Sequence, residues 1–172
     1  MQIIETKVYT FDELSDSAKD KARQWYREGA LDHEWWDCTY DDAKTIGLKI
    51  TSFGLDRDRG AEGVFIADAE ECAHKIEKEH GETCETFKTA KDYLAKRDAC
   101  VNAAEKDSNG ELIDERGLEL DLDDLDTAFL ASLLEDYAII LQKEYEYLLS
   151  DEAVDESIIA NEYTFTEGGK RF

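Results

Sequence analysis

The chain of 172 residues has a length typical of one compact domain, and its apolar content of 42% is sufficient for a hydrophobic core. Acidic residues number 43 against 20 basic residues, which gives a formal net charge of −23 at pH 7. A chain with this charge repels nucleic acid and anionic membrane surfaces, so the composition excludes direct nucleic-acid binding and favours a positively charged protein partner.

The first third of the chain predicts one strand followed by two helices. Alternating and β-branched residues over 2–9 indicate a strand. Thr10-Phe-Asp-Glu13 is a capping-box pattern and predicts the start of a helix that ends near Glu28. A second helix is expected from Asp32 to Gly47, so that helices occupy most of 16–46. Its aromatic residues, together with those of the first helix, are expected to form core or an interface; they are Trp25, Tyr26, Trp35, Trp36 and Tyr40.

The middle of the chain predicts a hairpin and two helices. Two strand-like segments, 48–53 and 63–67, flank a turn-rich stretch and favour an antiparallel hairpin. Helical periodicity then returns over 68–80 and 83–105. The sequence therefore alternates between short strands and helices.

The last third of the chain predicts a long acidic helix. Its apolar residues recur at helical spacing over 124–149, and a short helix at 152–160 and a strand at 162–166 follow. We expect the terminal strand to pair with the strand over 2–9, because each needs a partner for its backbone groups. The fold class is α+β, a single domain over 1–172 with a small antiparallel sheet of about three to four strands packed against several helices.

The negative charge is concentrated in residues 105–160, which contain 18 acidic and 3 basic residues. A helix that carries carboxylates at i, i+3, i+4 and i+7 has the charge pattern that a basic groove for nucleic acid binds. The alternative is a solvated face that gives only solubility or an adaptation to high salt. The carboxylates expected on the partner-binding surface are Glu119, Asp121, Asp123, Asp124, Asp126, Glu135, Asp136, Glu144, Glu146, Asp151, Glu152, Asp155 and Glu156.

Motifs at both ends of the chain resemble a family of uncharacterised proteins from phages and prophages. They are the opening VYTFDELSDSAKDKARQWYREG, the stretch EWWDCTYDDAKTIGLKI and the close KEYEYLLSDEAVDESIIANEYTFTEGGKRF. The resemblance covers residues 1–55 and 143–172, and the chain departs from the family pattern over 56–120. It implies a phage setting, where small acidic proteins often block host defences, but no activity that carries over to particular residues. The stretch GLELDLDD, 117–124, is also similar to the tail of an anti-CRISPR protein.

Other candidate sites have incomplete patterns. The loop with Glu105, Asp107 and Asn109 has part of a calcium-loop spacing, but Arg116 occupies the place of the bidentate ligand, so a turn is preferred. A possible zinc site has weaker support still, because its candidate ligands are expected on different sides of a helix. A possible acid/base site is also weak, because a histidine on a helix surface is commoner than a catalytic one. These residues are Cys72, His74, His80 and Cys84 for zinc, and His33, Asp37 and Asp41 for acid/base chemistry.

The four cysteines are too scattered for a disulfide scaffold, and the N-terminus lacks a signal-peptide pattern, so we expect reduced thiols and the bacterial cytoplasm. No cofactor, metal or catalytic residue is expected, and no membrane partner. The sequence thus favours a phage-type anti-defence inhibitor, anti-CRISPR or antirestriction, that mimics nucleic acid at the basic site of a host complex. A structural or accessory phage protein that binds a basic partner is the alternative, and a metal-dependent nuclease is the third.

Overall fold

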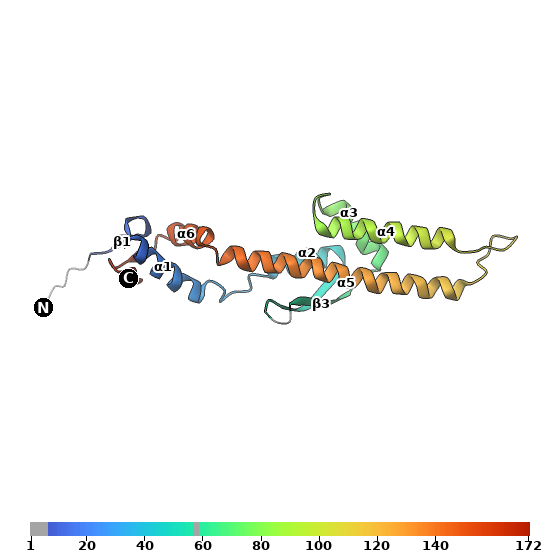
Figure 1. Ribbon diagram of the computed structural model, residues 1–172, viewed down its shortest axis with the longest axis horizontal. Coiled ribbons are helices and arrows are strands. Elements are labelled where there is room, and N and C mark those ends of the chain that lie inside the picture. Colours follow the sequence, from blue (N-terminus) through green and yellow to red (C-terminus); the bar gives the residue numbers. More distant parts are fainter. Residues whose placement is uncertain (1–6, 57–58) are drawn as a thin grey trace. The chain divides into compact units, whose positions relative to one another are not determined.

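The computed structural model describes residues 7–56 and 59–172 (Figure 1). The elements follow one another in the order β1 (Tyr9–Thr10), η1 (Phe11–Glu13), α1 (Asp16–Gly29), α2 (Asp37–Ile46), β2 (Leu48–Gly54), β3 (Gly60–Phe65), α3 (Ala69–Glu79), α4 (Glu85–Ala103), α5 (Glu115–Leu148), α6 (Asp151–Ala160) and β4 (Thr164–Phe165). Helices dominate and the strands pair antiparallel, which confirms the α+β class. The four strands of the described residues form two sheets of two strands each, rather than one.

Two compact units divide the chain. The first unit contains residues 7–35 and 143–172, and the second contains residues 36–142. The organisation as one domain over 1–172 stays a prediction. Each unit is described separately below.

The sheet of the first unit joins the two ends of the chain. β1 pairs antiparallel with β4, with Tyr9 opposite Phe165 and Thr10 opposite Thr164. This confirms the predicted pairing for the described residues, whereas residues 2–6 of the expected strand lie outside them. The sheet brings Phe165 under η1 and α1, where its side chain is fully buried.

The core of the first unit forms between α1, α6 and this sheet. Trp25 packs on it with its ring centroid 5.3 Å from that of Tyr163 and 5.8 Å from that of Phe165. The predicted capping box is present, since the Thr10 N–H donates to Glu13 Oε2 over 2.8 Å. It closes a single 3-10 turn, however, and α1 begins at Asp16, with Ser15 as its N-cap residue. The buried residues are Phe11, Leu14, Ala18, Ala22, Val154, Ile158 and Phe165.

The second unit packs a hairpin and four helical segments around a larger core. β2 and β3 pair antiparallel as predicted, with Leu48 opposite Phe65 and a register shift between Ile50 and Ser52. Gly63 lets the hairpin approach α5, because a Cβ there would lie 2.6 Å from Lys49 O and 2.9 Å from the side chain of Leu134. The fully buried side chains include Ile46, Leu48, Cys72, Ala73, Ile76, Ala90, Leu133 and Tyr137.

Two helices begin elsewhere than the sequence predicts. α2 begins at Asp37 rather than near Asp32, since residues before it form turns, with the Trp35 N–H donating to His33 O over 2.8 Å. α5 begins at Glu115 rather than at residue 124, so the acidic stretch 117–124 is helical. This second difference places most of the predicted partner-binding carboxylates on one helix.

Candidate partner-binding surface

The predicted carboxylates are divided between the two units. The second unit carries those on the first part of α5, which are Glu119, Asp121, Asp123, Asp124, Asp126, Glu135 and Asp136. The first unit carries those at the end of α5 and on α6, which are Glu144, Glu146, Asp151, Glu152, Asp155 and Glu156. The structure therefore presents two acidic groups, and each is considered within its own unit.

The start of α5 carries a group of exposed carboxylates that we call the α5 acidic patch. Its members are Glu119, Asp121, Asp123 and Asp124, all of them solvent-exposed. Among the described residues, none of the four accepts a hydrogen bond or forms an ion pair. Since nothing within the described protein neutralises them, these carboxylates are available to an outside cation.

Asp126 and Asp136 have a different role, because both are half-buried between α4 and α5. Asp126 Oδ1 accepts a hydrogen bond of 2.6 Å from the Tyr93 hydroxyl and lies 3.8 Å from an Arg97 nitrogen. Asp136 Oδ2 accepts a hydrogen bond of 2.6 Å from the Thr89 hydroxyl, and burial raises the pKa of its carboxyl group. These two residues hold α4 against α5 instead of facing a partner.

The first unit also uses two of its predicted carboxylates internally. Asp155 accepts from Nε and Nη2 of Arg23 over 2.6 and 2.7 Å, a bidentate pair that joins α6 to α1. Asp151 accepts from Arg27, and this hydrogen bond, followed by the charge of Arg23, lowers the pKa of Asp151. The remaining predicted residues of this unit are solvent-exposed, namely Glu144, Glu146, Glu152 and Glu156.

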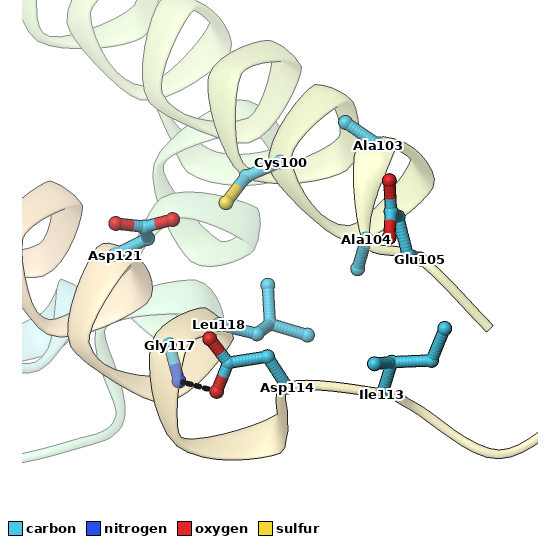
Figure 2. A pocket seen from close by; sticks show the side chains of 9 residues that line it. All are labelled: Cys100, Ala103, Ala104, Glu105, Ile113, Asp114, Gly117, Leu118 and Asp121. Carbon is cyan, nitrogen blue, oxygen red and sulfur yellow. Dashed lines mark hydrogen bonds between the residues drawn. The ribbon is translucent and has the colours of Figure 1, made fainter. Parts of the chain in front are cut away.

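A hollow of about 380 Å³ opens between the end of α4 and the start of α5, beside the α5 acidic patch (Figure 2). Figure 2 shows the sulfur of Cys100 and the side chain of Leu118 between the two helices, with Ile113 on the loop that precedes α5. Carboxylates of Glu105, Asp114 and Asp121 also line it. The sequence analysis did not predict this hollow. The sequence feature that indicates it is the presence of two apolar residues, Ile113 and Leu118, within an acidic stretch.

The loop with partial calcium-loop spacing folds as a turn. Asp107 Oδ1 accepts backbone hydrogen bonds from Asn109 and Glu111 over 2.8 and 2.9 Å, and Gly110 has a φ of +85°. An aspartate that accepts from the backbone two residues on stabilises a turn locally. The Asp107 carboxylate therefore shapes the connection between α4 and α5.

The zinc and acid/base candidates do not come together as the sequence allowed. Cys72 is fully buried, whereas His74 is exposed and lies 3.5 Å from a Glu77 oxygen. His33 precedes the first residue of α2, so it does not share a helix with Asp37. Over residues 7–56 and 59–172, no group of three or more histidine, cysteine or acidic side chains is placed to hold a metal ion.

A polar network inside the second unit connects four elements. The Tyr137 hydroxyl on α5 donates to Asp42 Oδ2 on α2 over 2.7 Å, and Asp42 Oδ1 lies 3.6 Å from His80 Nε2. His80, at the end of α3, contacts the Thr86 hydroxyl on α4 through Nδ1 over 2.8 Å. Thr86 is only 2% exposed, whereas the Asp42 side chain is 50% exposed, so the network joins the helices and reaches solvent at Asp42.

The aromatic residues of 16–46 pack against other rings. Trp36 and Tyr40 lie against Phe53 in the second unit, with centroids 5.6 and 6.2 Å from that ring. Trp35 lies 6.0 Å from Tyr145 in the first unit. These residues are partly buried packing groups.

No protein-family model matches the chain, and neither a curated protein nor a solved structure is significantly similar to it. Within the described residues, none of the helices combines the length and the apolar character needed to cross a lipid bilayer.

Proposed function

We propose that the protein is an anti-defence inhibitor of the phage type, which occupies the basic nucleic-acid-binding site of a host protein complex with carboxylates in the place of phosphates. The observation that supports this proposal is the α5 acidic patch, whose exposed carboxylates have no partner among the described residues. A set of like charges on one rigid helix is a template for a basic surface, whereas charges already paired internally are not.

The spacing of the patch fits this role. The six residues from Glu119 to Asp124 occupy about 9 Å of helix axis at a rise of about 1.5 Å per residue, so the helix carries one charge per about 2.3 Å there. B-DNA carries one charge per about 1.7 Å of its axis. The linear charge density of the α5 acidic patch is therefore lower than that of B-DNA but of the same order.

The experiment is a charge reversal limited to the exposed residues. A variant with Asp121→Lys, Asp123→Lys and Asp124→Lys leaves Asp126 and Asp136 in place, and with them the hydrogen bonds to Tyr93 and Thr89 of α4. The control variant reverses three exposed carboxylates elsewhere in the second unit, Asp41, Glu82 and Asp98, and so has the same net charge. Thermal unfolding checks that both variants fold.

In the measurement, the protein competes with labelled DNA for binding to purified CRISPR effector and restriction complexes. Displacement of the DNA is detected by fluorescence anisotropy at 0.1 M and 0.5 M salt. We expect the wild-type protein and the control variant to displace the DNA, and the patch variant to need at least tenfold higher concentrations. Displacement should also weaken with salt, because the Debye length falls from about 10 Å at 0.1 M to about 3 Å at 1 M. Equal loss in both variants would instead show that net charge alone acts, without a specific role for the α5 acidic patch.

A further inference from the structure

The hollow between α4 and α5 combines exposed apolar side chains with an acidic rim. Ile113, which lines it, is 63% exposed. Cys100, Ala103, Ala104 and Leu118 complete its apolar wall. Exposed apolar groups that gather at a concave site mark a binding surface more often than scattered ones do.

The rim of the hollow is acidic. Glu105, Asp114 and Asp121 line it, and no lysine or arginine is among its described lining residues. Asp114 is held in place because its Oδ1 accepts the Gly117 N–H over 2.8 Å (Figure 2). Gly117 permits this approach, since a Cβ at that position would lie 2.3 Å from Asp114 Oδ2. The carboxylate of Asp114 is therefore fixed at the edge of an apolar site.

We infer that this hollow receives an apolar side chain from a basic segment of the partner protein, while lysine or arginine residues beside that side chain contact Glu105, Asp114 and Asp121. The inference rests on the proposed function and specifies its partner. Charge complementarity selects the occupant, because an acidic rim repels acidic segments and attracts basic ones. A hollow of about 380 Å³ is at the small end of the range for ligand pockets and has room for one or two side chains.

An apolar anchor changes how binding depends on salt. Contacts between exposed charges are screened at high ionic strength, but burial of an apolar side chain is not. A partner that uses the hollow should therefore keep part of its affinity at 0.5 M salt, whereas a partner that contacts only the α5 acidic patch should lose it.

The test compares two synthetic peptides of equal length and equal lysine content, one with leucine and the other with serine at every third or fourth position. Binding to the full chain is measured by fluorescence anisotropy at 0.1 M and 0.5 M salt. We expect the leucine peptide to bind at least tenfold more tightly than the serine peptide and to remain bound at 0.5 M salt. Both peptides should bind at 0.1 M salt, since both are attracted by the carboxylates.

Two isoleucine variants make the test specific for the hollow. Ile113→Asp adds a negative charge that attracts lysine, so any loss of leucine-peptide binding must come from the apolar contact. The control is Ile139→Asp on α5, which changes the same residue type at another exposed position, 44% exposed in the native chain. We expect about a tenfold loss for Ile113→Asp with the leucine peptide, and no loss for Ile139→Asp or with the serine peptide.

Cys100 provides an independent readout, because its sulfur lies in the hollow. In a Cys38→Ser, Cys84→Ser background, the remaining cysteine besides Cys100 is Cys72, which is buried and whose pKa burial raises to about 12. Alkylation by N-ethylmaleimide, followed by mass spectrometry, then reports on Cys100. The leucine peptide should slow this alkylation at least fivefold, and the serine peptide should not.

The outcomes separate the inference from the proposed function. Equal binding of both peptides, with equal loss at 0.5 M salt and no protection of Cys100, overturns the inference and leaves the acidic-surface function standing. Failure of both peptides to bind at 0.1 M salt overturns the inference and the proposed function together. Tighter, salt-resistant binding of the leucine peptide that Ile113→Asp abolishes supports both.

Discussion

The hydroxyl group of Tyr137 on α5 donates a hydrogen bond of 2.7 Å to Asp42 Oδ2 on α2, across 95 residues of sequence. Tyr137 is fully buried, and Asp42 also contacts His80, whose Nε2 is buried without a hydrogen-bond partner among the described residues. The buried Tyr137 hydroxyl therefore has its hydrogen-bond partner on another helix, in a carboxylate that is 50% exposed.

Removal of this hydroxyl should destabilise the protein. Tyr137→Phe keeps the ring but takes a hydrogen-bond donor from a carboxylate, which typically costs about 1 to 3 kcal/mol of unfolding free energy. Tyr147→Phe is the matched control, because Tyr147 is 51% exposed and its loss should stay within about 0.5 kcal/mol. Urea unfolding of both variants checks the prediction, and an equal effect in the two would contradict it.

The lowered pKa of Asp42 leads us to expect a loss of stability in acid. Contact with His80, followed by the Tyr137 hydrogen bond, lowers the pKa of Asp42 in the folded protein. The unfolded chain therefore binds the proton more readily, so this stabilisation is present above the unfolded pKa and is lost as the pH falls through the folded pKa. We expect Asp42→Asn to be less stable than the wild type at neutral pH and to approach it in acid, as measured by thermal unfolding across pH.

The charge of Asp136 should affect stability in the opposite direction from that of Asp42. Burial raises the pKa of Asp136, so the folded protein binds the proton more readily and a penalty accumulates as the pH rises through the folded pKa. Asn at this position can still accept from Thr89 but carries no charge. Asp136→Asn should therefore gain stability over the wild type at neutral pH, and the gain should vanish below the unfolded pKa. A destabilised Asp136→Asn at pH 7 would count against this explanation.

The ion pair between α1 and α6 should matter to the first unit. Arg23 and Asp155 are 18% and 26% exposed at their side chains, and Asp155→Ala leaves the guanidinium group without its bidentate partner. We expect a loss of about 1 to 2 kcal/mol, between the values for exposed and for buried pairs. Glu152→Ala on the same helix is the control, since Glu152 is exposed. Urea denaturation of the two variants gives the comparison.

Two glycines with positive φ should differ in their response to alanine. Gly110 and Gly169 have φ values of +85° and +82°. A residue with an L side chain is destabilised by about 1 kcal/mol in this left-handed region of backbone conformation. A Cβ at Gly110 meets nothing within 4 Å, whereas a Cβ at Gly169 would lie 2.1 Å from Ala18 O. Gly169→Ala should therefore lower the melting temperature clearly more than Gly110→Ala does. Similar melting temperatures for the two variants would show that the loop at Gly169 moves aside freely.

Local patterns predicted the elements better than they predicted the partners of each side chain. The helix over 69–79 and the hairpin follow from periodicity and turns, and both are present. Acidic residues alternate with leucines before residue 124, and alternation of this kind is typical of a strand rather than a helix. However, Leu118, Leu122 and Leu125 already have helical spacing. The contacts of Asp126 with Tyr93 and of Asp136 with Thr89 join residues 33 and 47 positions apart, and no local pattern contains them. A count of acidic residues thus identifies a charged helix but does not separate free carboxylates from those that hold it in place.

The first unit is assembled from segments that the ribosome makes at different times. Phe11 and Ala18 pack with Val154 and Phe165, so the N-terminal segment cannot form this core until the C-terminal segment has been synthesised. At a synthesis rate of about 5 to 20 residues per second, this delay is on the order of ten seconds. Residues 36–142 have their contacts within one continuous stretch and can fold during that time. A chain whose synthesis stops before residue 143 would therefore keep its early apolar side chains exposed, which makes the first unit dependent on completed translation.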